Sequence, residues 1–302
     1  KSTTTVMTTE ARAAAGKAPT GVVGARVRAW GGNLSDGAHE VFVVEADEYD
    51  RSFLALWPTV AVVTNVEADH LDIYADLADI TATFAEFVRR ARYVVLCADD
   101  PGANALPSPA TAEVIRYGIT SPDARLVAHD VRHVDGGSVF NVRYDGKELG
   151  EIRLAVPGLH NVRNALAAIA CGLGPWALTL EQMAPGLARF VGAERRFERL
   201  RRARDVDVVD DYAHHPTEVR ATLAAAREAF PGRRIVVAFQ PHLFSRTRDF
   251  ATEFGEALAS ADACYLVDIY PAREQPMPGV TSGLIADAMT KAGRAPVWRG
   301  PR

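Results

Sequence analysis

The sequence predicts an α/β protein of two domains: a P-loop-type domain with a mainly parallel sheet, then a Rossmann-like, doubly wound domain. Short apolar runs rich in β-branched residues alternate with helical segments along most of the chain. These runs end in polar residues, as parallel strands do where ligands bind. The alternation breaks near residues 191–204 and then restarts, so we place the domain boundary between residues 192 and 193.

The first five residues resemble the second half of a phosphate-binding loop, G-x-x-x-x-G-K-[ST], at the start of a helix. They read Lys1-Ser2-Thr3-Thr4-Thr5. The glycines of such a loop would precede residue 1, so we expect a chain that lacks material at its N-terminus and also at its C-terminus. An ordinary Ser/Thr-rich helix start is the alternative interpretation.

Two short apolar strands, residues 41–44 and 60–65, are each followed by an acidic turn. We expect both to be neighbouring parallel strands, covered on both faces, that deliver their turns to one sheet edge. A cluster of carboxylates with an imidazole needs a cation, and Mg²⁺ with a nucleotide phosphate would supply it. The turns carry Glu45, Asp47, Glu48 and Asp50, then Glu67, Asp69 and His70.

Some of these acids have simpler interpretations. Asp47, Glu48 and Asp50 also fit solvated turn residues, and we favour this for Asp50. Glu67 and Asp69 flank the histidine, so they fit a role in orienting it rather than in binding.

The rest of the first domain, residues 1–192, alternates helices with short strands. We expect an irregular, glycine-rich stretch over residues 21–40 and a tight turn at Asp145-Gly146. The predicted helices cover residues 2–16, 78–92, 160–171 and 180–190, and the predicted strands cover residues 93–97 and several runs within 113–156.

The second domain, residues 193–302, repeats the alternation. Three successive strands end in His, Arg, Asp and Tyr, and their convergence on one edge indicates an anion site that Arg246 and Arg273 suit. A cap formed by His215 and an ion pair of Asp268 with Arg273 are alternatives. The predicted strands are 206–209, 234–239 and 263–267, and the predicted helices are 218–230, 250–260 and one after Ser282.

The composition excludes several classes of protein. Of 302 residues, 48% are hydrophobic and 24% charged, which is ordinary for a globular protein. A net charge of −4 and a pI of about 6.1 give no electrostatic reason to expect nucleic acid as a partner. The sequence has no apolar run of membrane-spanning length and no signal peptide, so we expect no membrane partner. Cys97, Cys171 and Cys264 are far apart and indicate buried thiols of a cytoplasmic protein.

Longer motifs, in order along the whole chain, resemble the Mur ligase family. They are Glu-Ala-Asp-Glu at 45–48, Thr-Asn-Val-Glu-Ala-Asp-His at 64–70, His-Asn-x-x-Asn-Ala at 160–165, and residues 210–218, 239–242 and 268–274. The sequence is identified as a member of this family. The resemblance implies a three-domain enzyme, of which this chain holds the central ATPase domain and most of the C-terminal domain. The absent N-terminal domain would grip the UDP-sugar.

Within the family, the resemblance implies ATP-dependent joining of L-alanine to the lactyl carboxylate of UDP-N-acetylmuramate, in cytoplasmic synthesis of the peptidoglycan precursor. ATP would phosphorylate the carboxylate, the amine of alanine would attack the acyl phosphate, and phosphate would leave. ATP and Mg²⁺ are the implied cofactors. We expect the chain alone to be inactive, because the loop glycines and the sugar-binding domain are absent. The oligomeric state and the discrimination against glycine or serine stay open.

The resemblance also implies roles for single residues. Lys1 would contact the β- and γ-phosphates, with Ser2 on Mg²⁺ and Thr3 beside the nucleotide. Glu45 and His70 would bind Mg²⁺, His70 a second ion. The other implied nucleotide contacts are Asn161 and Asn164 to adenine, Arg196 to the phosphates and Asp211 to the ribose. The amino acid and acyl-phosphate site would be lined by Tyr212, His214, His242 and Arg246, and the implied catalytic residues are Lys1, Glu45, His70, His214 and Arg246.

One departure from the family pattern lies after Phe239, where Leu243 stands in the place of a frequent arginine. Arg246 or Arg248 would then have to supply the lost contact. Two other functions stay open. A sister enzyme of the family, which joins a tripeptide to the same sugar, shares the Glu-Ala-Asp-Glu-Tyr-Asp form. A non-catalytic P-loop nucleotide-binding module is the other, but it would not need the polar residues 212–218.

Overall fold

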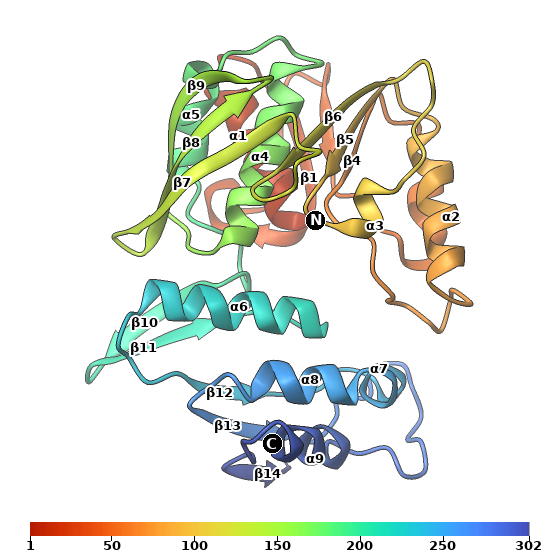
Figure 1. Ribbon diagram of the computed structural model, residues 1–302, viewed down its shortest axis with the longest axis vertical. Helices are drawn as coiled ribbons and strands as arrows, with labels where there is room; N and C mark the ends of the chain where they lie inside the picture. Colours follow the sequence, from red (N-terminus) through yellow and green to blue (C-terminus); the bar gives the residue numbers. More distant parts are fainter. Residues whose placement is uncertain (302) are drawn as a thin grey trace. The chain divides into compact units, whose positions relative to one another are not determined.

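The structure is a computed structural model that describes residues 1–301, and it divides into two compact units (Figure 1). The first unit runs from Lys1 to Asp211, and the second begins at Tyr212. The domain boundary expected between residues 192 and 193 stays a prediction. The division into compact units falls later in the chain, after Asp211, so residues 193–211 group with the first unit. No helix in residues 1–301 is long and apolar enough to cross a membrane.

The main sheet of the first unit has six strands in the order β4-β5-β6-β7-β8-β9. Strands β4 to β7 run parallel, and β7, β8 and β9 form an antiparallel meander. Turns at Asp135-Gly136 and Asp145-Gly146 join the meander, and all four residues have the positive φ that two-residue hairpin turns need. The strands are β4 Val60–Val63, β5 Tyr93–Cys97, β6 Glu113–Gly118, β7 Leu126–Val134, β8 Gly137–Tyr144 and β9 Lys147–Leu154.

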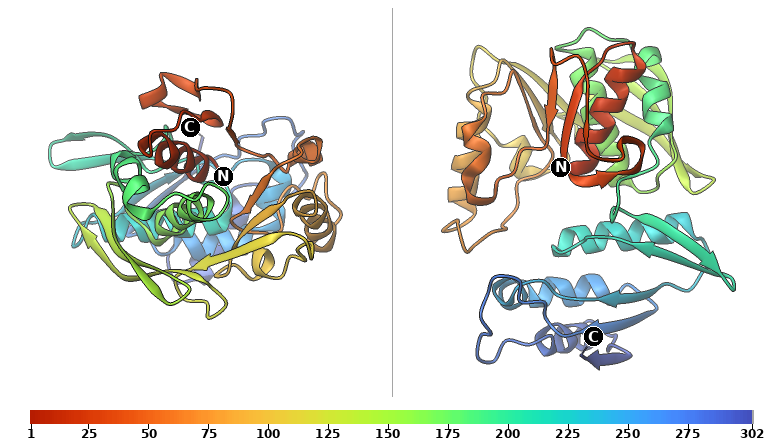
Figure 2. Two further views of the ribbon diagram at one scale, coloured as in Figure 1. Left: turned by 90° about the horizontal axis from the view of Figure 1, so that it is seen from above. Right: turned by 180° about the vertical axis from the view of Figure 1, so that it is seen from behind.

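The helices of the first unit share one apolar core with this sheet. Helix α1 packs against both α4 and α5, and the three stay grouped in every view (Figure 2). The approach is close: a Cβ on Gly186 would lie 2.2 Å from the carbonyl oxygen of Glu10. The predicted helices are confirmed, with a short α3 in addition. The helices are α1 Ser2–Ala14, α2 Leu77–Val88, α3 Pro101–Asn104, α4 Leu159–Leu173 and α5 Leu180–Arg189.

A second sheet of three strands, in the order β2-β1-β3, corrects one expectation. Residues 21–35 are not irregular, whereas residues 36–40 carry no helix or strand, as expected. Residues 21–35 form most of β1 (Thr20–Val27), a 3-10 turn η1 (Arg28–Trp30) and β2 (Gly32–Ser35), and β3 (Phe42–Val44) runs parallel to β1. Gly21 serves close packing rather than a turn, since a Cβ there would lie 2.8 Å from Oγ1 of Thr9. Gly31, with φ +68°, turns the chain.

The prediction that β3 is covered on both faces is wrong. Phe42 is 57% exposed and Val44 is 42% exposed. Strands β3 and β4 also belong to different sheets, so the prediction that they are neighbours is wrong. The sequence runs of β3 and β4 are equally apolar, and hydrophobicity alone does not distinguish an exposed edge strand from one covered on both faces.

Residues 191–204, where the predicted alternation breaks, contain a strand. Strands β10 (Glu198–Ala203) and β11 (Val206–Asp210) form an isolated antiparallel hairpin, so the prediction that residues 206–209 open the second parallel sheet is wrong. The loop between them is Arg204-Asp205, and both residues have positive φ, of 47° and 62°. This is a tight hairpin turn made without glycine, which is why the sequence does not reveal it.

The second unit has a three-stranded parallel sheet in the order β12-β13-β14. Its apolar core includes Phe254, Leu266 and Ile285. The alternation of strands and helices is as predicted, but the short helix α7 and strand β14 are additional. The elements are α6 Pro216–Ala229, β12 Val236–Phe239, α7 Phe244–Asp249, α8 Ala251–Leu258, β13 Ala263–Val267, α9 Gly283–Lys291 and β14 Trp298–Gly300.

Candidate active site

Lys1, which precedes helix α1, lies against the acidic turn after β3. Its Nζ is 2.9 Å from Oδ1 of Asp47 and 2.7 Å from Oε2 of Glu48. Burial lowers the pKa of Lys1, but the carboxylates, Glu48 first, outweigh it and raise the pKa above its ordinary value. The pKa of Glu48 is about 2: burial raises it, and His70 and Lys1 lower it by more. Glu48 is therefore a partner of two site residues rather than a solvated turn acid.

Ser2 and Glu45 lie together beside this pair. Ser2 Oγ donates to Oε1 of Glu45 over 3.0 Å, and Oε2 of Glu45 accepts from the backbone N–H of Gly24 over 2.7 Å. The pairing of β3 with β1 places Glu45, whose own N–H donates to the carbonyl of Val22 over 2.9 Å. Each oxygen of the Glu45 carboxylate thus accepts a hydrogen bond, one from Ser2 and one from Gly24.

His70 reaches the same acidic turn from the loop after β4. Its Nε2 is 3.5 Å from Oε1 of Glu48 and 3.7 Å from Oδ2 of Asp69, and its ring packs edge-on against Tyr49 at 5.2 Å. The Asp69 carboxylate also accepts the backbone N–H of His70, which has φ +52°. Nδ1 of His70 is buried without a hydrogen-bond partner. Such an atom costs free energy unless a ligand meets it.

The acidic turn is held in a strained conformation. Asp50 and Arg51, in η2 (Tyr49–Ala55), have φ of +54° and +55°, which costs roughly 1–3 kcal/mol for residues other than glycine. Arg51 donates to both carboxylate oxygens of Asp79 on α2, over 2.8 and 2.7 Å. Tyr74 Oη donates to the carbonyl of Glu48 over 2.5 Å. These contacts fix the turn that carries Glu48.

The start of α4 brings Asn161 and Asn164 to α1. Thr4 Oγ1 donates to Oδ1 of Asn164 over 2.9 Å, and Nδ2 of Asn164 donates to Oδ1 of Asn161 over 3.4 Å. Asn161 is buried and donates to the carbonyl of Pro157 over 2.7 Å. Thr3, which lies between Ser2 and Thr4 in the sequence, is half-buried. The expected phosphate and adenine residues are therefore linked through one helix.

Arg196 and Asp211, the other two expected nucleotide contacts, lie close together in the first unit. Oδ2 of Asp211 accepts from the backbone N–H of Phe197 over 2.7 Å. The backbone N–H of Arg196 donates to the carbonyl of Ala193 over 3.1 Å, and its side chain is half-buried. The end of β11 thus lies beside the residue that follows Arg196.

In the second unit, the polar ends of β12 and β13 meet, as predicted. The rings of His214 and His242 are 6.2 Å apart, and His242 stacks with Tyr270 at 5.7 Å. Tyr212 packs edge-on against His214 at 5.0 Å. An isolated β-bridge between His242 and Tyr270 brings the strand ends together. Sequence reasoning gave Tyr270 no separate role, because this bridge leaves no local sequence signal.

Arg246 is buried beside His242, and the side chain of Leu243 is buried as well. Nη1 of Arg246 lies 3.4 Å from Nδ1 of His242, and Arg246 is 6% exposed. Burial, then Arg246 and His214, lower the pKa of His242 to about 4, so the imidazole is neutral at neutral pH. Leu243 is 3% exposed and has φ +73°, so its side chain lies in the interior.

Two polar residues of the second unit cap helices. Nδ1 of His215 accepts from the backbone N–H of Thr217 over 3.4 Å, and Glu218 accepts from the N–H of His215 over 3.2 Å, which completes a capping box for α6. The alternative interpretation of His215 as a cap is confirmed. Oε2 of Glu274 accepts from the N–H of Phe244 over 2.5 Å at the start of α7.

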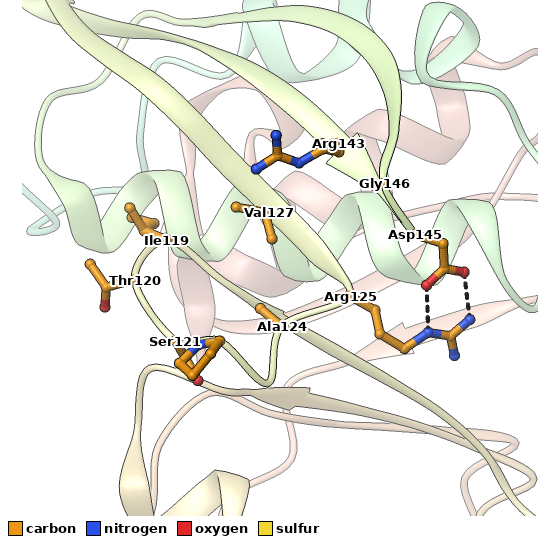
Figure 3. A pocket seen from close by; sticks show the side chains of 10 residues that line it. Ile119, Thr120, Ser121, Ala124, Arg125, Val127, Arg143, Asp145 and Gly146 are labelled. Atoms are coloured by element: carbon orange, nitrogen blue, oxygen red, sulfur yellow. Dashed lines mark hydrogen bonds and ion pairs between the residues drawn. The ribbon is translucent and has the colours of Figure 1, made fainter.

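A separate hollow of about 500 Å³ lies where residues 119–125 meet β7 and β8 (Figure 3). Arg125 lines it and donates to both carboxylate oxygens of Asp145, over 2.7 and 2.6 Å. None of the site residues expected from the sequence lines this hollow.

Two sequence profiles match the chain, the Mur ligase middle domain over residues 1–172 and the Mur ligase glutamate ligase domain over residues 195–299. The first match alone covers more than half of the chain. The chain belongs to the Mur ligase family.

The curated relatives of this Mur ligase chain include UDP-N-acetylmuramate–L-alanine ligases. The protein of Salinibacter ruber is 44% identical over 304 residues, which cover 100% of the chain and 64% of that protein. The protein of Acidothermus cellulolyticus is 48% identical over 304 residues, which cover 99% of the chain and 63% of that protein. The chain thus spans just under two thirds of the length of these relatives.

Solved structures of other Mur ligases share the fold. The UDP-N-acetylmuramate–alanine ligase of Thermotoga maritima superposes with a TM-score of 0.81 at 28% identity, over 99% of this chain and 64% of that chain. The MurF ligase of T. maritima in complex with ADP gives 0.73 at 18% identity, over 98% and 67%. The murein peptide ligase of Psychrobacter arcticus gives 0.67 at 21% identity, over 99% and 67%, and these two show the fold alone.

The donors of this Mur ligase site suit Mg²⁺, which takes oxygen ligands and is held by one or two protein groups with phosphate and water. Ser2 Oγ and Glu45 Oε1, 3.0 Å apart, are such donors. His70 offers a softer nitrogen, and its unpartnered, buried Nδ1 leaves a position for a ligand. No group of three or more His, Cys, Asp and Glu side chains within residues 1–301 could hold a metal ion. Phosphate oxygens and water would therefore complete the shell.

Proposed function

We propose that this chain forms the ATP-binding and amino-acid-binding part of a cytoplasmic ligase that joins L-alanine to the lactyl carboxylate of UDP-N-acetylmuramate. One observation carries the proposal: Lys1 and Ser2 stand at the start of α1 within hydrogen-bond distance of Glu48 and Glu45. A cation and a hydroxyl at a helix start, beside strand-end carboxylates, suit the phosphates of a nucleotide. Identities of 44% and 48% to alanine-adding ligases support the choice of substrates.

The nucleotide would lie along α1 and α4. Lys1 would exchange its contacts with Asp47 and Glu48 for contacts with the β- and γ-phosphates, so the fixed acidic turn keeps the ammonium near its target. The remaining contacts proposed are Thr3 beside the phosphates, Asn161 and Asn164 at adenine, Arg196 at the phosphates and Asp211 at the ribose.

The reaction joins a carboxylate to an amine in two steps. A lactyl carboxylate oxygen attacks the γ-phosphorus of ATP, and the bond from that phosphorus to the oxygen bridging the β-phosphate breaks. The products of this step are an acyl phosphate and ADP. The alanine ammonium loses one proton, and its neutral nitrogen then attacks the acyl carbon. The nitrogen loses a second proton in the tetrahedral intermediate, and phosphate leaves with one oxygen of the former carboxylate. Mg²⁺ held by Ser2 and Glu45, with a second ion at His70, would neutralise phosphate charge. The side chains themselves position the reactants and stabilise charge.

The second unit would supply the amino-acid side of the site. Nδ1 of His214 lies 2.8 Å from the carbonyl oxygen of Tyr212. A carbonyl only accepts, so Nδ1 carries a hydrogen in this contact, and Nε2 is the other ring nitrogen. We assign Nε2 of His214 the proton that the alanine ammonium must lose. The buried cation of Arg246, beside neutral His242, suits the alanine carboxylate or the acyl phosphate.

Two other functions have less support. The murein peptide ligase of P. arcticus resembles this chain at 21% identity, which is a likeness of fold alone and gives no support for the tripeptide-joining function. A non-catalytic nucleotide-binding module would leave the cluster of His214, His242, Tyr270 and buried Arg246 without a purpose.

The test uses a chimera in which residues 1–302 replace the matching segment of the Salinibacter ruber ligase. The chimera is incubated with ATP, Mg²⁺, UDP-N-acetylmuramate and either L-alanine or L-alanyl-γ-D-glutamyl-diaminopimelate, and product masses are read. We expect an alanine adduct with release of ADP, no turnover by residues 1–302 alone, and loss of the product in Glu45→Gln but not in Asp50→Asn, the matched change of an exposed acid in the same turn. A tripeptide adduct, or ATP loss with neither adduct, would contradict the proposal.

A further inference from the structure

The carboxylate of Asp99 lies where strand β5 ends, and it joins two other parts of the first unit. Its Oδ2 accepts from the backbone N–H of Ile119 over 2.8 Å, and its Oδ1 accepts from the N–H groups of Thr120 and Ser121 over 3.0 and 2.9 Å. Oδ2 also accepts from Nε of Arg163 on α4 over 2.7 Å. A single side chain thus connects the main sheet, the loop after β6 and the start of α4.

This contact is built into the fold. The Asp99 side chain is 4% exposed. A Cβ on Gly118 would lie 2.6 Å from its Oδ1, so the glycine leaves the carboxylate its place. The pKa of Asp99 is about 2: burial raises it, and Arg163 and the three N–H groups lower it by more. A buried carboxylate with this many donors is held in one position, and Arg163 is the side-chain cation in contact with it.

Arg163 follows Asn161 and precedes Asn164 in the first turns of α4. The cap residue of this helix, Gly158, has no side chain with which to hold the helix start, and its φ is +95°. Asn164 contacts Thr4 of α1 over 2.9 Å and Asn161 over 3.4 Å, and both amides are carried by α4, so their position follows the position of that helix. The hydrogen bond from Nε of Arg163 to Asp99 holds the first turns of α4 against the end of β5.

We propose that the Asp99–Arg163 pair positions the amides of Asn161 and Asn164 and thereby sets the preference of the site for adenine over guanine. This inference rests on the proposed function, in which these two amides contact the base. Adenine presents an amino donor where guanine presents a carbonyl acceptor, so an amide held in one orientation distinguishes them and a mobile amide does not. The phosphate contacts of Lys1 and Ser2 do not involve the pair.

The test measures the dissociation constants of the whole 302-residue chain for ATP, GTP and inorganic triphosphate by NMR titration, which records weak binding. We expect Arg163→Met to lower the GTP-to-ATP ratio of dissociation constants about tenfold, by analogy with the loss of a side chain that orients a metal ligand. Triphosphate binding should not change, Asp99→Asn should act in the same direction, and Arg163→Lys should keep most of the preference.

The matched control is Arg125→Met, which breaks another arginine–carboxylate pair beside the loop that Asp99 holds (Figure 3). It should keep the ratio of the unaltered chain. An unchanged ratio in both Arg163→Met and Asp99→Asn, with ATP still bound, would overturn the inference and leave the proposed function standing. Equal loss of all three ligands would indicate a merely structural role and would also overturn it. If the unaltered chain does not prefer ATP, the proposed adenine contacts fail, and the inference fails with them.

Discussion

Nζ of Lys1 lies 2.9 Å from Oε1 and 2.7 Å from Oε2 of Glu48, so one carboxylate holds the ammonium with both oxygens. The same carboxylate is 3.5 Å from Nε2 of His70. Glu48 therefore connects the proposed phosphate-binding cation with the imidazole, while Glu45 holds the hydroxyl of Ser2. ATP would have to compete with Glu48 for Lys1, which keeps the cation in place until a nucleotide arrives.

The Glu48 contacts should stabilise the first unit in a pH-dependent way. Its pKa is lowered from 4.5 to about 2, so its contribution is fully present above pH 4.5 and is lost as the pH falls towards 2. Glu48→Gln should lower the melting temperature at pH 7 by roughly 5–10 °C, and the difference should shrink below pH 4.5. Calorimetry from pH 7 to pH 3 measures this, with Asp50→Asn as control. Equal melting temperatures at pH 7 would contradict the ion-pair assignment.

The neutral state of His242 should depend on its neighbours. Its pKa is lowered from 6.5 to about 4, so the unfolded chain takes up a proton between these values that the folded chain does not, and the second unit loses stability as the pH falls through this window. Burial is the first cause and Arg246 the second, so Arg246→Met should raise the pKa of His242 without restoring it fully. Histidine NMR titration measures this. Arg248→Met is the control, because Arg248 pairs with Asp249, and an equal rise there would refute the role of Arg246.

Restoring the arginine that the family often carries at position 243 should not improve this protein. The Leu243 side chain is 3% exposed and lies in the interior, at a residue with φ +73°. Leu243→Arg would bury an unpaired charge, so we expect a loss of about 3 kcal/mol or more in the free energy of unfolding and no gain in ligase activity of the chimera. Leu243→Met, which keeps an apolar side chain, should cost less than about 1.5 kcal/mol. Higher activity in Leu243→Arg would show that this side chain faces the substrate.

The hydrogen bond from the N–H of Gly24 to Glu45 should affect the Mg²⁺ concentration that gives half-maximal activity. A Cβ on Gly24 would lie 3.3 Å from Oε2 of Glu45, whereas a Cβ on Gly32 would meet nothing within 4 Å. Gly24→Ala should therefore shift the carboxylate and raise the Mg²⁺ concentration for half-maximal activity of the chimera severalfold, while Gly32→Ala should not. A Mg²⁺ titration of product formation compares the two variants. Identical titrations would place the metal away from Glu45.

Sequence reasoning predicted most of the fold where the chemistry is local. The apolar run of β5, the 3.6-residue spacing of α4 and the Asp145-Gly146 turn each carry their own signal. It failed where the cause is distant. Gly21 lies in a strand, where a Cβ would be 2.8 Å from Oγ1 of Thr9, and the exposed face of β3 depends on the sheet to which β3 belongs.

The candidate site divides in the same way. The partial phosphate-loop motif indicates Lys1 and Ser2, the family resemblance implies Glu45, and the structure brings the three residues to one place. The double pairing of Glu48, the stacking of Tyr270 on His242 and the Asp99–Arg163 bond join segments far apart in sequence. No local pattern encodes such contacts, so they could be found only in the folded chain.

The most direct test of the central claim follows an oxygen atom. UDP-N-acetylmuramate labelled with ¹⁸O in its lactyl carboxylate is given to the chimera with ATP, Mg²⁺ and L-alanine, and the released phosphate is examined by ³¹P NMR. Ligation through an acyl phosphate transfers one carboxylate oxygen to phosphate, so we predict one ¹⁸O in each phosphate released, in proportion to alanine adduct formed. Unlabelled phosphate, or label that appears only with the tripeptide, would contradict the account.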